Sequence, residues 1–498
     1  MTAVPGVAGH LASTVERCGA RTALVDGDRR LSWDQLAEAV ERRAAALAHR
    51  DVGPGHALAV VLPNDTDFVV TFLAVQRLGA LAVPLNPLFT VAELGRHLAG
   101  CHVRGIATTA ALAPAIAEWA DRTTAGEGTW VAPAADLDRD AASAAGAPAP
   151  PATDGPALYA FSSGSTGTPK GMVRTAAQLA AEADNFYDTV GVTEGDAILA
   201  LVALFHAHGL GNAVLASVRS GATLVLQAAL RRDETLALIE SERVSIFPTV
   251  PFAAQTLAET RRADRADTGS LRLAFTAGAP LARETFDLWG KRFGTPLRQL
   301  YGCSEAGSVT INLDDDADAT AGSVGRPMKG IDLAIVREDG APCAPGENGE
   351  ITFASPAATT GYDGVPPQDN ARSFAGGWFR TSDLGHVDAA GNLYVAGRTK
   401  LFISTAGYKV DPFEVEDVIL RHPAVADVVV VGAAGSLGEE VVKAVVVHTE
   451  VTDDRQLRHE LLALCREELA VHKVPRIVAF RDEIPRSPLG KILRKYLV

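Results

Sequence analysis

Cysteine is scarce in this chain, and its cysteines form no recognisable set. The 498 residues contain five of them, widely separated along the sequence: Cys18, Cys101, Cys303, Cys343 and Cys465. No Cys-x-x-Cys pair occurs, and no spacing is typical of a metal site. The pattern argues against a disulfide framework and fits reduced thiols, so we expect a cytoplasmic protein.

Targeting and membrane signals are also missing. The first residues show no basic segment followed by an apolar core, so we expect no signal peptide. No apolar run approaches the length that a bilayer span requires. Positive charge is in deficit, because 46 Lys and Arg face 60 Asp and Glu, which gives a net charge of −14. That balance argues against nucleic acid or an anionic membrane as the main partner.

The composition is otherwise that of an ordinary globular protein. Hydrophobic residues make up 47% of the chain and charged residues 21%. A chain of 498 residues exceeds the usual size of one domain, so we expect two or more.

One stretch stands out, from Tyr159 to Gly171, and reads Y-A-F-S-S-G-S-T-G-T-P-K-G. An apolar, β-prone approach leads into glycines, which let the backbone come close to a ligand. Successive backbone N–H groups in such a turn form an anion-binding concavity. The common phosphate loop ends in Gly-Lys-Ser/Thr, which is absent here. An ordinary surface turn is the alternative, but the order of residues favours a polyphosphate site. The predicted ligand-binding residues are Ser162, Ser163, Gly164, Ser165, Thr166, Gly167, Thr168 and Lys170.

This stretch carries a family resemblance. The string S-S-G-S-T-G-T-P-K-G matches, without a mismatch, the signature loop of the adenylate-forming enzymes. That superfamily includes acyl-CoA synthetases, nonribosomal peptide adenylation domains and beetle luciferases. Further motifs of the family follow in its order, up to residue 491. The resemblance implies an enzyme that uses ATP and Mg²⁺ to activate a carboxylic acid.

The patterns of the N-terminal third predict alternating helices and strands. Residues 31–50 have apolar positions at helical spacing, with a capping-box pair at Ser32 and Gln35. Leu58 to Leu62 is a continuous apolar run that ends in a turn, as a buried strand does. Residues 132–156, rich in Ala, Pro and Asp, predict a loose surface connection.

A second series of strand and helix patterns follows the glycine-rich stretch. Thr175 and Gln178 have the spacing of another capping box, at the start of an Ala-rich helix. Two series of similar size predict an α/β fold with two packed subdomains. Short strand-like segments with Gly and Asp turns at 320–396 predict a small antiparallel β-barrel. Beyond it, a helix start at Asp411-Pro412 and runs of valine predict a separate α+β domain.

The resemblance implies domain boundaries within this fold. It sets a large N-terminal domain at 1–397 that binds ATP and the acid, a hinge at 398–400, and a smaller, mobile C-terminal domain at 401–498. Lys400 takes the hinge position, although Leu401 stands where many relatives have Asp.

The sequence F-H-A-H-G-L contains the candidate acid-binding histidine. From spacing alone, His206 is more often structural than catalytic. The resemblance places it beside the substrate carboxylate, where the amino-acid-activating branch has Asp. A plain carboxylic acid is therefore favoured over an α-amino acid. The predicted acid pocket consists of His206, Gly209, Leu210, Ala277, Gly302 and Gly307. These residues are mostly small, and these segments contain no lysine or arginine that could bind a second carboxylate of the substrate. We therefore expect an apolar aliphatic or aromatic monocarboxylic acid.

Two further motifs, T-A-G-A-P and Y-G-C-S-E, would surround the nucleotide, although each alone is more often an ordinary loop. By resemblance they border the adenine, and Glu305 reaches the Mg²⁺ ion, which favours carboxylate and phosphate oxygens. Ser304 replaces the usual Thr and keeps the hydroxyl. The predicted nucleotide-binding residues here are Gly278, Ala279, Tyr301, Gly302 and Ser304.

The motifs W-F-R-T-S-D-L-G and G-R-T-K complete the predicted nucleotide site; alone, each is more often a turn between strands. A carboxylate can accept hydrogen bonds from both ribose hydroxyls, and the resemblance gives this role to Asp383 and places Arg398 near the ribose and phosphate. In T-A-G-Y, Gly407 is expected to line the channel for the pantetheine arm of coenzyme A, although Ala406 replaces a more usual Gly.

The C-terminal string P-R-S-P-L-G-K resembles the catalytic-lysine signature of the family; the alternative is a basic surface tail. When a carboxylate attacks the α-phosphate of ATP, two anions meet. A compact ammonium that bridges both oxygens stabilises that transition state. By resemblance, the expected catalytic residues are Lys491, His206 and Glu305.

The resemblance implies two half-reactions. ATP and the acid give an acyl-adenylate and pyrophosphate; the C-terminal domain then swings about Lys400, and the thiol of CoA displaces AMP. One alternative is an acyl-AMP ligase that loads the phosphopantetheine of an acyl carrier protein. Another is a luciferase-like oxygenase. A non-catalytic nucleotide-binding module is disfavoured, because such a binder would not need Lys491.

Overall fold

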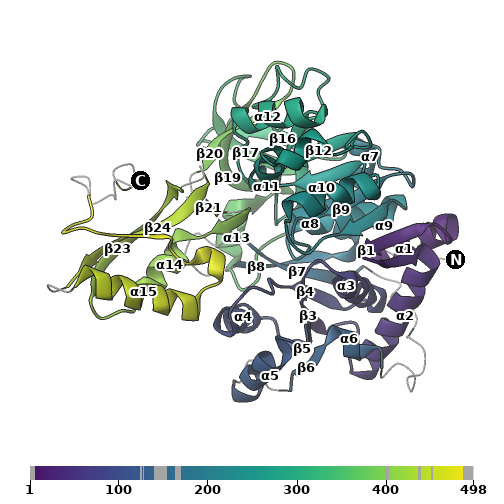
Figure 1. The fold of residues 1–498 in the computed structure, drawn as a ribbon, viewed down its shortest axis with the longest axis horizontal. Coiled ribbons are helices and arrows are strands. Elements are labelled where there is room, and N and C mark those ends of the chain that lie inside the picture. Colours follow the sequence, from purple (N-terminus) through teal and green to yellow (C-terminus); the bar gives the residue numbers. More distant parts are fainter. Residues whose placement is uncertain are drawn as a thin grey trace. The chain divides into compact units, whose positions relative to one another are not determined.

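The computed structural model describes residues 6–123, 126, 128–139, 148, 154–162, 170–398, 403–405, 407–435, 439–449, 453–485 and 497 (Figure 1). The chain divides into two compact units. The larger unit comprises Met1–Pro87, Gly100–Phe161 and Gly171–Arg398, and the smaller one comprises Leu88–Ala99, Ser162–Lys170 and Thr399–Val498. The mixed α/β architecture confirms the predicted fold class.

The first sheet of the larger unit has nine strands. Their order is β15 (Arg326–Pro327), β14 (Gly307–Ile311), β13 (Leu297–Cys303), β12 (Leu273–Thr276), β11 (Ile246–Thr249), β9 (Ala197–Ala200), β10 (Thr223–Leu226), β1 (Thr22–Asp26) and β2 (Arg29–Ser32). The strands from β13 to β1 run parallel to one another, whereas β2, β14 and β15 run antiparallel to their neighbours at the edges.

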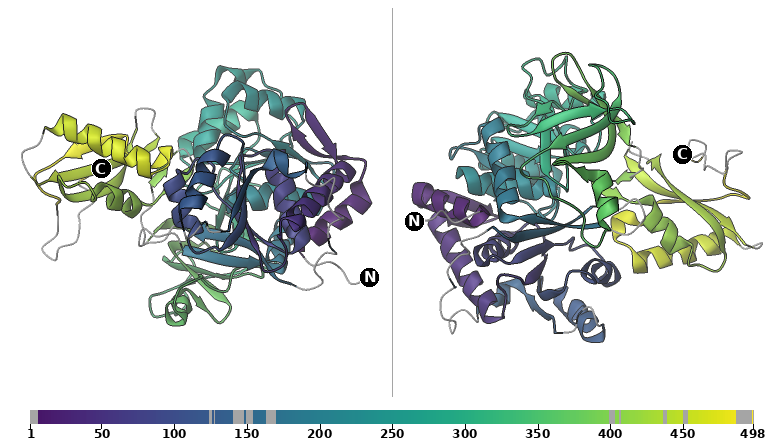
Figure 2. Two further views of the ribbon diagram at one scale, coloured as in Figure 1. Left: turned by 90° about the horizontal axis from the view of Figure 1, so that it is seen from below. Right: turned by 180° about the vertical axis from the view of Figure 1, so that it is seen from behind.

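Both faces of this sheet are buried. Successive residues of a strand point to opposite faces, and accordingly Leu24 lies in one apolar cluster while Val25 lies in another. Burial on both faces explains the continuous apolar sequences of the central strands. The helices that cover the Val25 face, drawn in teal in Figure 2, are α10 (Arg232–Ser241), α11 (Pro251–Ala258) and α12 (Arg283–Phe293).

The second sheet of the larger unit has six strands. Their order is β6 (Trp130–Pro133), β5 (Val103–Thr108), β3 (Ala57–Val61), β4 (Leu81–Pro84), β7 (Pro156–Ser162) and β8 (Lys170–Thr175). The strands from β6 to β7 are parallel. Strand β3 confirms the predicted strand at Leu58–Leu62 to within one residue. Two α/β subdomains are thus present, as expected.

Both predicted capping boxes form. Helix α2 (Trp33–His49) begins after Ser32, whose hydroxyl accepts a hydrogen bond from the backbone N–H of Gln35 while the Gln35 side chain accepts one from the Ser32 backbone. The same reciprocal pair opens α7 (Ala176–Val190). The remaining helices of the larger unit are α1 (Gly6–Cys18), α3 (Thr66–Leu78), α5 (Ala113–Arg122), α6 (Ala134–Leu137), α8 (Ala207–Gly209), the π-helix η3 (Leu210–Leu215), α9 (Ala216–Ser220), the 3-10 helix η4 (Arg261–Asp264) and α13 (Pro367–Ser373).

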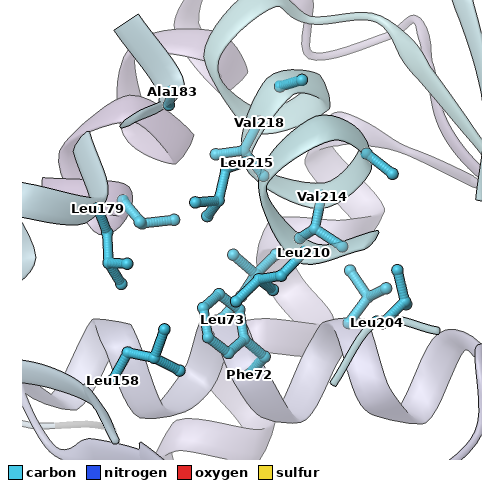
Figure 3. Packing of buried hydrophobic residues seen from close by; sticks show 14 of the residues in the cluster. Phe72, Leu73, Leu158, Leu179, Ala183, Leu204, Leu210, Val214, Leu215 and Val218 are labelled. Carbon is cyan, nitrogen blue, oxygen red and sulfur yellow. The ribbon is translucent and has the colours of Figure 1, made fainter. Parts of the chain in front are cut away.

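One apolar core joins the two sheets. Phe72 and Leu73 of α3 face Leu210 and Val214 of η3, with Leu158 of β7 beside them (Figure 3). The same cluster includes side chains from strands of both sheets. The elements that follow β9 are therefore held against the six-stranded sheet by apolar burial.

The prediction of a loose connection at 132–156 is wrong for its first part. Residues 134–137 form α6, and Leu137 is fully buried. Asp138 pairs with the buried guanidinium of Arg43 on α2, with Oδ1 at 2.6 Å from Nε. A buried partner in a distant helix orders this Ala-rich segment. Most of the remaining residues up to 153 lie outside the described residues.

The strands at the C-terminal end of the larger unit form a five-stranded sheet, and every recorded pairing in it is antiparallel, as predicted. No pairing among the described residues closes this sheet into the predicted barrel. The sheet follows the order β16, β17, β19 and β18, with β20 also paired to β19. The strands are β16 (Asp332–Val336), β17 (Gly349–Ala354), β18 (Phe374–Ala375), β19 (Trp378–Val387) and β20 (Leu393–Arg398).

The C-terminal part of the smaller unit has the predicted α+β character. Asp411 caps α14 (Pro412–Ile419), and Pro412 stands at its first turn. The helices α14 and α15 share one apolar cluster with the sheet. The other elements are the hairpin β21 (Ile403–Thr405) and β22 (Tyr408–Val410), the three-stranded sheet β23 (Val425–Ala434), β24 (Glu440–His448) and β25 (Ile477–Phe480), α15 (Asp454–Glu468) and the 3-10 helix η5 (Val471–Lys473).

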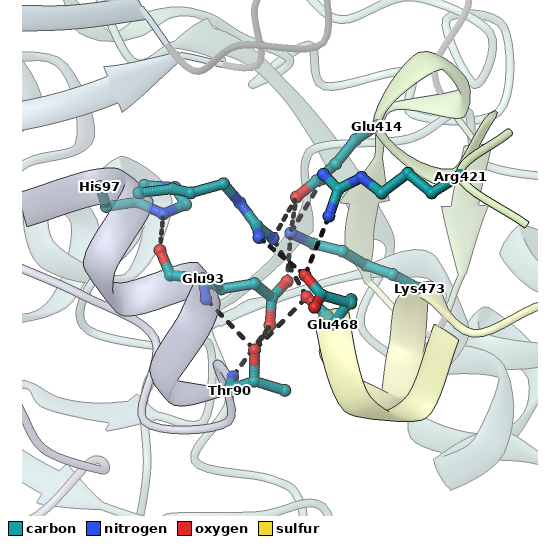
Figure 4. A network of polar contacts seen from close by, with 8 residues as sticks. Thr90, Glu93, His97, Glu414, Arg421, Glu468 and Lys473 are labelled. Atoms are coloured by element: carbon teal, nitrogen blue, oxygen red, sulfur yellow. Dashed lines mark hydrogen bonds and ion pairs between the residues drawn. The ribbon is translucent and has the colours of Figure 1, made fainter. Parts of the chain in front are cut away.

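A buried ionic network lies within the smaller unit (Figure 4). Its centre is Lys473, whose Nζ lies 2.8 Å from Glu93 of α4 (Val91–Leu98) and 2.9 Å from Glu414 of α14. The Glu93 side chain has no exposed surface. Burial alone would raise the pKa of Glu93, but the charge and hydrogen bond of Lys473 outweigh it and lower that pKa. Charge pairing therefore holds α4 to the C-terminal elements.

Replacing Lys473 by Met should lower the free energy of unfolding by about 3–5 kcal/mol at pH 7, because the Glu93 carboxylate would stay buried without a partner. In the wild type, ionised Glu93 adds to the free energy of unfolding at pH values above its unfolded pKa of about 4.3. This stabilisation is lost as the pH falls below that value, since the folded pKa of Glu93 is lowered. The difference between the two proteins should therefore shrink as the pH falls toward about 4. Urea unfolding at several pH values measures both effects.

The matched control is Arg421→Met, which removes an exposed ion pair with Glu468 and should cost at most about 1 kcal/mol. Equal losses for the two variants would contradict the role given to the buried network.

Candidate active site

Several predicted site residues follow the carboxyl ends of neighbouring parallel strands. His206 comes after β9, Gly278 directly after β12, and Glu305 directly after β13. Strands β9, β11, β12 and β13 are consecutive in the nine-stranded sheet and parallel. Their carboxyl ends therefore meet at one edge, where open α/β sheets bind ligands. This topology brings together motifs that are far apart in the sequence.

Asp383 and Tyr301 form a buried pair. The Tyr301 hydroxyl donates to Oδ2 of Asp383 across 2.6 Å, and the two residues are 9% and 1% exposed. Burial, followed by the charge of Asp383, raises the pKa of Tyr301 well above its usual range, so the hydroxyl keeps its proton. Ser382, next to Asp383, has a φ of 61°, a strained value for a residue with a side chain. Arg398 is the partner of Asp383 in the β19–β20 register; its side chain lies outside the described residues.

Glu305 is a buried carboxylate, 6% exposed, with hydrogen bonds on two of its groups. Its Oε1 accepts from the Tyr362 hydroxyl at 2.7 Å, and its backbone carbonyl accepts from the Thr359 N–H at 2.8 Å. Burial, and then the charge of Glu305, raises the pKa of the Cys303 thiol well above its usual range. The neighbouring cysteine is therefore a neutral thiol.

The acidic groups at this edge suit a magnesium site in which one protein carboxylate acts together with substrate phosphates. Within the described ranges, no cluster of three or more His, Cys, Asp or Glu side chains could hold a metal by itself. Magnesium in nucleotide enzymes uses one or two carboxylates together with substrate phosphates. The single buried carboxylate of Glu305 fits that donor set.

His206 has an exposed side chain and precedes α8, with its ring 5.2 Å from that of Phe205. The chain leading to it is held by Asn64, whose Nδ2 donates to the carbonyls of Ala200 and Val202 at 3.0 and 2.9 Å. Oδ1 of Asn64 also accepts from the Leu204 N–H at 2.9 Å. Sequence reasoning identified Asn64 only as part of a turn, since a turn asparagine carries no sign of a partner far along the chain.

The predicted acid-pocket residues differ in where their side chains lie. Leu210 is 3% exposed and packs in the core against Phe72 and Leu73 (Figure 3). Gly307 has a φ of 75°, and a Cβ built there would lie 2.0 Å from Oε1 of Glu182. A Cβ on Gly302 would lie 2.3 Å from the Gly307 carbonyl oxygen. Glycine is therefore required at both positions. Ala277 and Gly209 are buried, Ala279 and Ser304 are half-buried, and Gly278 is exposed.

A polar network beside these residues was not predicted. Asn212 contacts Nδ1 of His208 at 2.9 Å and accepts a hydrogen bond from the Ser308 hydroxyl at 2.8 Å. Nε2 of His208 lies 2.9 Å from the Thr249 carbonyl oxygen, so the neutral tautomer with the proton on Nε2 satisfies both ring nitrogens. The network joins η3, β14 and the end of β11.

A buried ion pair also escaped sequence reasoning. Arg174 of β8 and Glu182 of α7 are 1% and 3% exposed and lie 2.7 Å apart. Arg174 Nε also donates to the Ala357 carbonyl at 3.0 Å. Oε1 of Glu182 has no hydrogen-bond partner among the described residues, and burial raises the pKa of this carboxyl although Arg174 opposes the effect. The pair lies directly behind Gly307.

Several predicted residues lie outside the described residues: Ser163, Gly164, Ser165, Thr166, Gly167, Thr168, Lys400 and Lys491. The ends of the phosphate loop are described, because Ser162 closes β7 and Lys170 opens β8. Gly407 has a φ of 86° and immediately precedes β22. Their proposed roles remain predictions.

Gly307→Ala should destabilise the protein strongly, by about 3–5 kcal/mol, because the new methyl must displace a buried carboxylate. Gly340→Ala is the matched control: its φ of 86° is similar, but nothing lies within 4 Å of the added Cβ. The control should cost only the backbone strain, about 1–2 kcal/mol. Urea unfolding compares the two, and similar losses would show that Glu182 does not restrict this position.

Two family models match the chain. The AMP-binding enzyme model covers residues 11–363, and the model of the AMP-binding enzyme C-terminal domain covers residues 414–491. Together they contain most of the motifs that carry the resemblance.

Named relatives agree with this match. An indoleacetate–CoA ligase of Aromatoleum aromaticum is 35% identical, over 95% of this chain and 93% of its own length. A feruloyl-CoA synthase of Amycolatopsis is 34% identical, over 95% and 94%. Among solved structures, a double mutant of o-succinylbenzoate CoA synthetase from Bacillus subtilis, bound to a product analogue, superposes with a TM-score of 0.88 at 28% identity, over 99% and 98% of the two chains. The chain thus belongs to the AMP-binding, adenylate-forming enzyme family, in its acyl-CoA synthetase branch.

Proposed function

We propose that this enzyme uses ATP to activate an apolar monocarboxylic acid and transfers the acyl group to coenzyme A, with release of pyrophosphate and AMP. The observation that carries the proposal is that His206 and Glu305 follow the carboxyl ends of parallel strands in one sheet, where such folds bind ligands. Tyr301, near the end of the same strand that precedes Glu305, binds Asp383. The relatives named above act on indoleacetate and ferulate, both aromatic acids. An aromatic acid is therefore favoured over an aliphatic one.

The nucleotide would be held by residues from four loops. Asp383 is well suited to the ribose, because Tyr301 keeps its carboxylate buried and oriented. Gly278 and Tyr301 would border the adenine, with Ala279, Gly302 and Ser304 nearby and Arg398 toward the phosphate. Backbone N–H groups and hydroxyls of the loop from Ser162 to Lys170 would bind the β- and γ-phosphates.

Glu305 would provide the protein's carboxylate for Mg²⁺. A bound magnesium ion would supply positive charge to the phosphates and favour departure of pyrophosphate. The chain contributes a carboxylate fixed by two hydrogen bonds, one to its side chain and one to its backbone.

The acid would lie with its carboxylate near His206. The exposed imidazole of His206 can approach a ligand. Because position 206 is a histidine and not an aspartate, it offers no carboxylate to bind a substrate amino group. Gly209, Ala277, Gly302 and Gly307 would form a wall beside the acyl part, and protein atoms occupy the space behind the three glycines. Leu210 contributes to the packing behind this wall.

The two half-reactions would use different parts of the C-terminal region. We place the N-terminal domain at 1–397, the hinge at 398–400 with Lys400, and the C-terminal domain at 401–498. Lys491 would stabilise the charge that builds as the carboxylate attacks the α-phosphate. After a swing of the domain, the hairpin containing Gly407 would border the pantetheine arm.

The acceptor and the cellular location are part of the proposal. An acyl carrier protein presents the same phosphopantetheine arm as CoA and is the alternative acceptor. None of the five cysteines, all of which are described, forms a disulfide, which fits the expected cytoplasmic location. No helix of the described part of the chain has the length and apolar character to cross a membrane.

The first test is pyrophosphate release across a panel of aromatic, aliphatic and amino acids, with and without CoA. We expect release with aromatic monocarboxylic acids and an acyl-CoA product when CoA is present. Acid-dependent release without acyl-CoA would favour the carrier protein, which a phosphopantetheinylated carrier would then test. Oxygen uptake would indicate the luciferase-like alternative, and no release with any acid would refute the proposal.

Separate assays of the two half-reactions test the role of Lys491. Lys491→Ala should reduce adenylate formation by about 10²–10³-fold, the effect of losing one group that stabilises transition-state charge. Thioester formation from a supplied acyl-adenylate should stay close to wild type. Parallel loss in both assays would contradict a domain swing that withdraws this lysine.

A further inference from the structure

Glu305 receives a hydrogen bond from a residue that the proposed function does not use. The hydroxyl of Tyr362 donates to Oε1 of Glu305 at 2.7 Å. Tyr362 follows Glu305 by a long stretch of chain, and its loop also donates the Thr359 N–H to the Glu305 carbonyl at 2.8 Å. The loop therefore contacts both the backbone and the side chain of Glu305.

Tyr362 is held in place on three sides. Asn370 of α13 binds both backbone groups of Tyr362: Oδ1 accepts from its N–H at 2.8 Å, and Nδ2 donates to its carbonyl at 2.9 Å. The ring packs edge-on against Phe374, with centroids 5.2 Å apart. A β-bridge joins Tyr362 to Met172 of β8. With its backbone clamped and its ring packed, Tyr362 has little freedom to move its hydroxyl away from Glu305.

The same loop is tied to both strands that flank the glycine-rich phosphate loop. On β8, the Thr359 hydroxyl donates to the Val173 carbonyl at 2.8 Å, and the Asp363 N–H donates to the Gly171 carbonyl at 2.8 Å. On β7, the Tyr159 hydroxyl donates to Oδ2 of Asp363 at 2.9 Å. Residues 359–363 thus connect Glu305 to the two strands that flank the predicted phosphate loop.

We propose that Tyr362 is a positioning residue that fixes the Glu305 carboxylate relative to β7 and β8, the strands that flank the predicted phosphate loop, and that Asn370 in turn fixes Tyr362. The inference rests on the proposed function, in which Glu305 serves the Mg²⁺ ion of Mg·ATP. A carboxylate held in one position by the protein would be ready to serve as a ligand of that ion. Hydrogen-bond partners of this kind orient metal ligands in other sites.

Tyr362→Phe removes the hydroxyl and keeps the ring that packs on Phe374. The Kd of ATP should rise about tenfold in excess Mg²⁺, the size expected for one hydrogen bond to a charged group. In EDTA the Kd should equal that of wild type, because the phosphate loop is unchanged. The Mg²⁺ concentration for half-maximal pyrophosphate release should rise by a similar factor. Isothermal titration with ATP, in both conditions, gives the binding values without turnover.

The matched control is Tyr187→Phe. Tyr187 lies on α7 with its ring 4.2 Å from the Arg219 guanidinium, and its hydroxyl makes no hydrogen bond within the described ranges. This variant should keep wild-type binding in both conditions. A merely structural role of Tyr362 would instead weaken ATP binding equally with Mg²⁺ and with EDTA.

Asn370→Ala provides the second variant, because it leaves the Tyr362 hydroxyl in the chain but frees the backbone that positions it. It should show the same Mg²⁺-dependent loss, and the double variant should be little worse than either single one, since both act through the same hydrogen bond. Additive losses would overturn the proposed link between Asn370 and Tyr362. If Tyr362→Phe does not fold, Asn370→Ala alone tests the positioning role, through the same comparison of the Kd of ATP in excess Mg²⁺ and in EDTA.

Failure of this inference can be distinguished from failure of the proposed function. Wild-type enzyme that releases pyrophosphate with an acid, together with a Tyr362→Phe variant that binds Mg·ATP normally, would overturn only the positioning role. Wild-type enzyme that binds Mg·ATP no better than ATP in EDTA would remove the magnesium role of Glu305 on which the inference rests.

Discussion

The buried ion pair of Arg174 and Glu182 is the contact on which the arrangement of the larger unit's site depends. Arg174 stands on the strand that leaves the phosphate loop, and it binds the Ala357 carbonyl just before the loop that reaches Glu305. Glu182 fills the space that the glycine at 307 leaves open. A fully buried pair of this kind is costly to break, because either charge alone would remain without water or a partner. It therefore holds β8, the segment at Ala357 and the backbone at Gly307 in one fixed relation.

The carboxylates of Asp383 and Glu305 are oriented in the same manner, each by a tyrosine hydroxyl. Asp383 accepts a hydrogen bond from Tyr301, and Glu305 accepts one from Tyr362. A tyrosine hydroxyl orients a carboxylate without adding a charge that would compete for the ligand. Under the proposed function, this arrangement would hold each carboxylate in the position where a ribose or a metal ion could use it.

The predictions made from the sequence were most accurate where the signal is local. The capping boxes at Ser32 and Thr175 depend on residues three positions apart, and both formed. The interpretation of 132–156 was wrong at α6 because the partner that orders Asp138 is Arg43, which is distant in the chain. Tyr362 and Asn370 gave no signal, since a tyrosine and an asparagine in a loop are common and their meaning lies in what they contact.

The sequence alone determined the family, the α/β character and the identity of the motifs, because a signature loop and alternating apolar runs are properties of adjacent residues. Only the tertiary structure decided which motifs meet at one edge of the nine-stranded sheet, that Leu210 packs in the core, and that Tyr362 contacts Glu305. The physical reason is that hydrogen bonds and burial act over a few ångströms in space. Residues far apart in the chain come within that range only after the two sheets pack on their shared core.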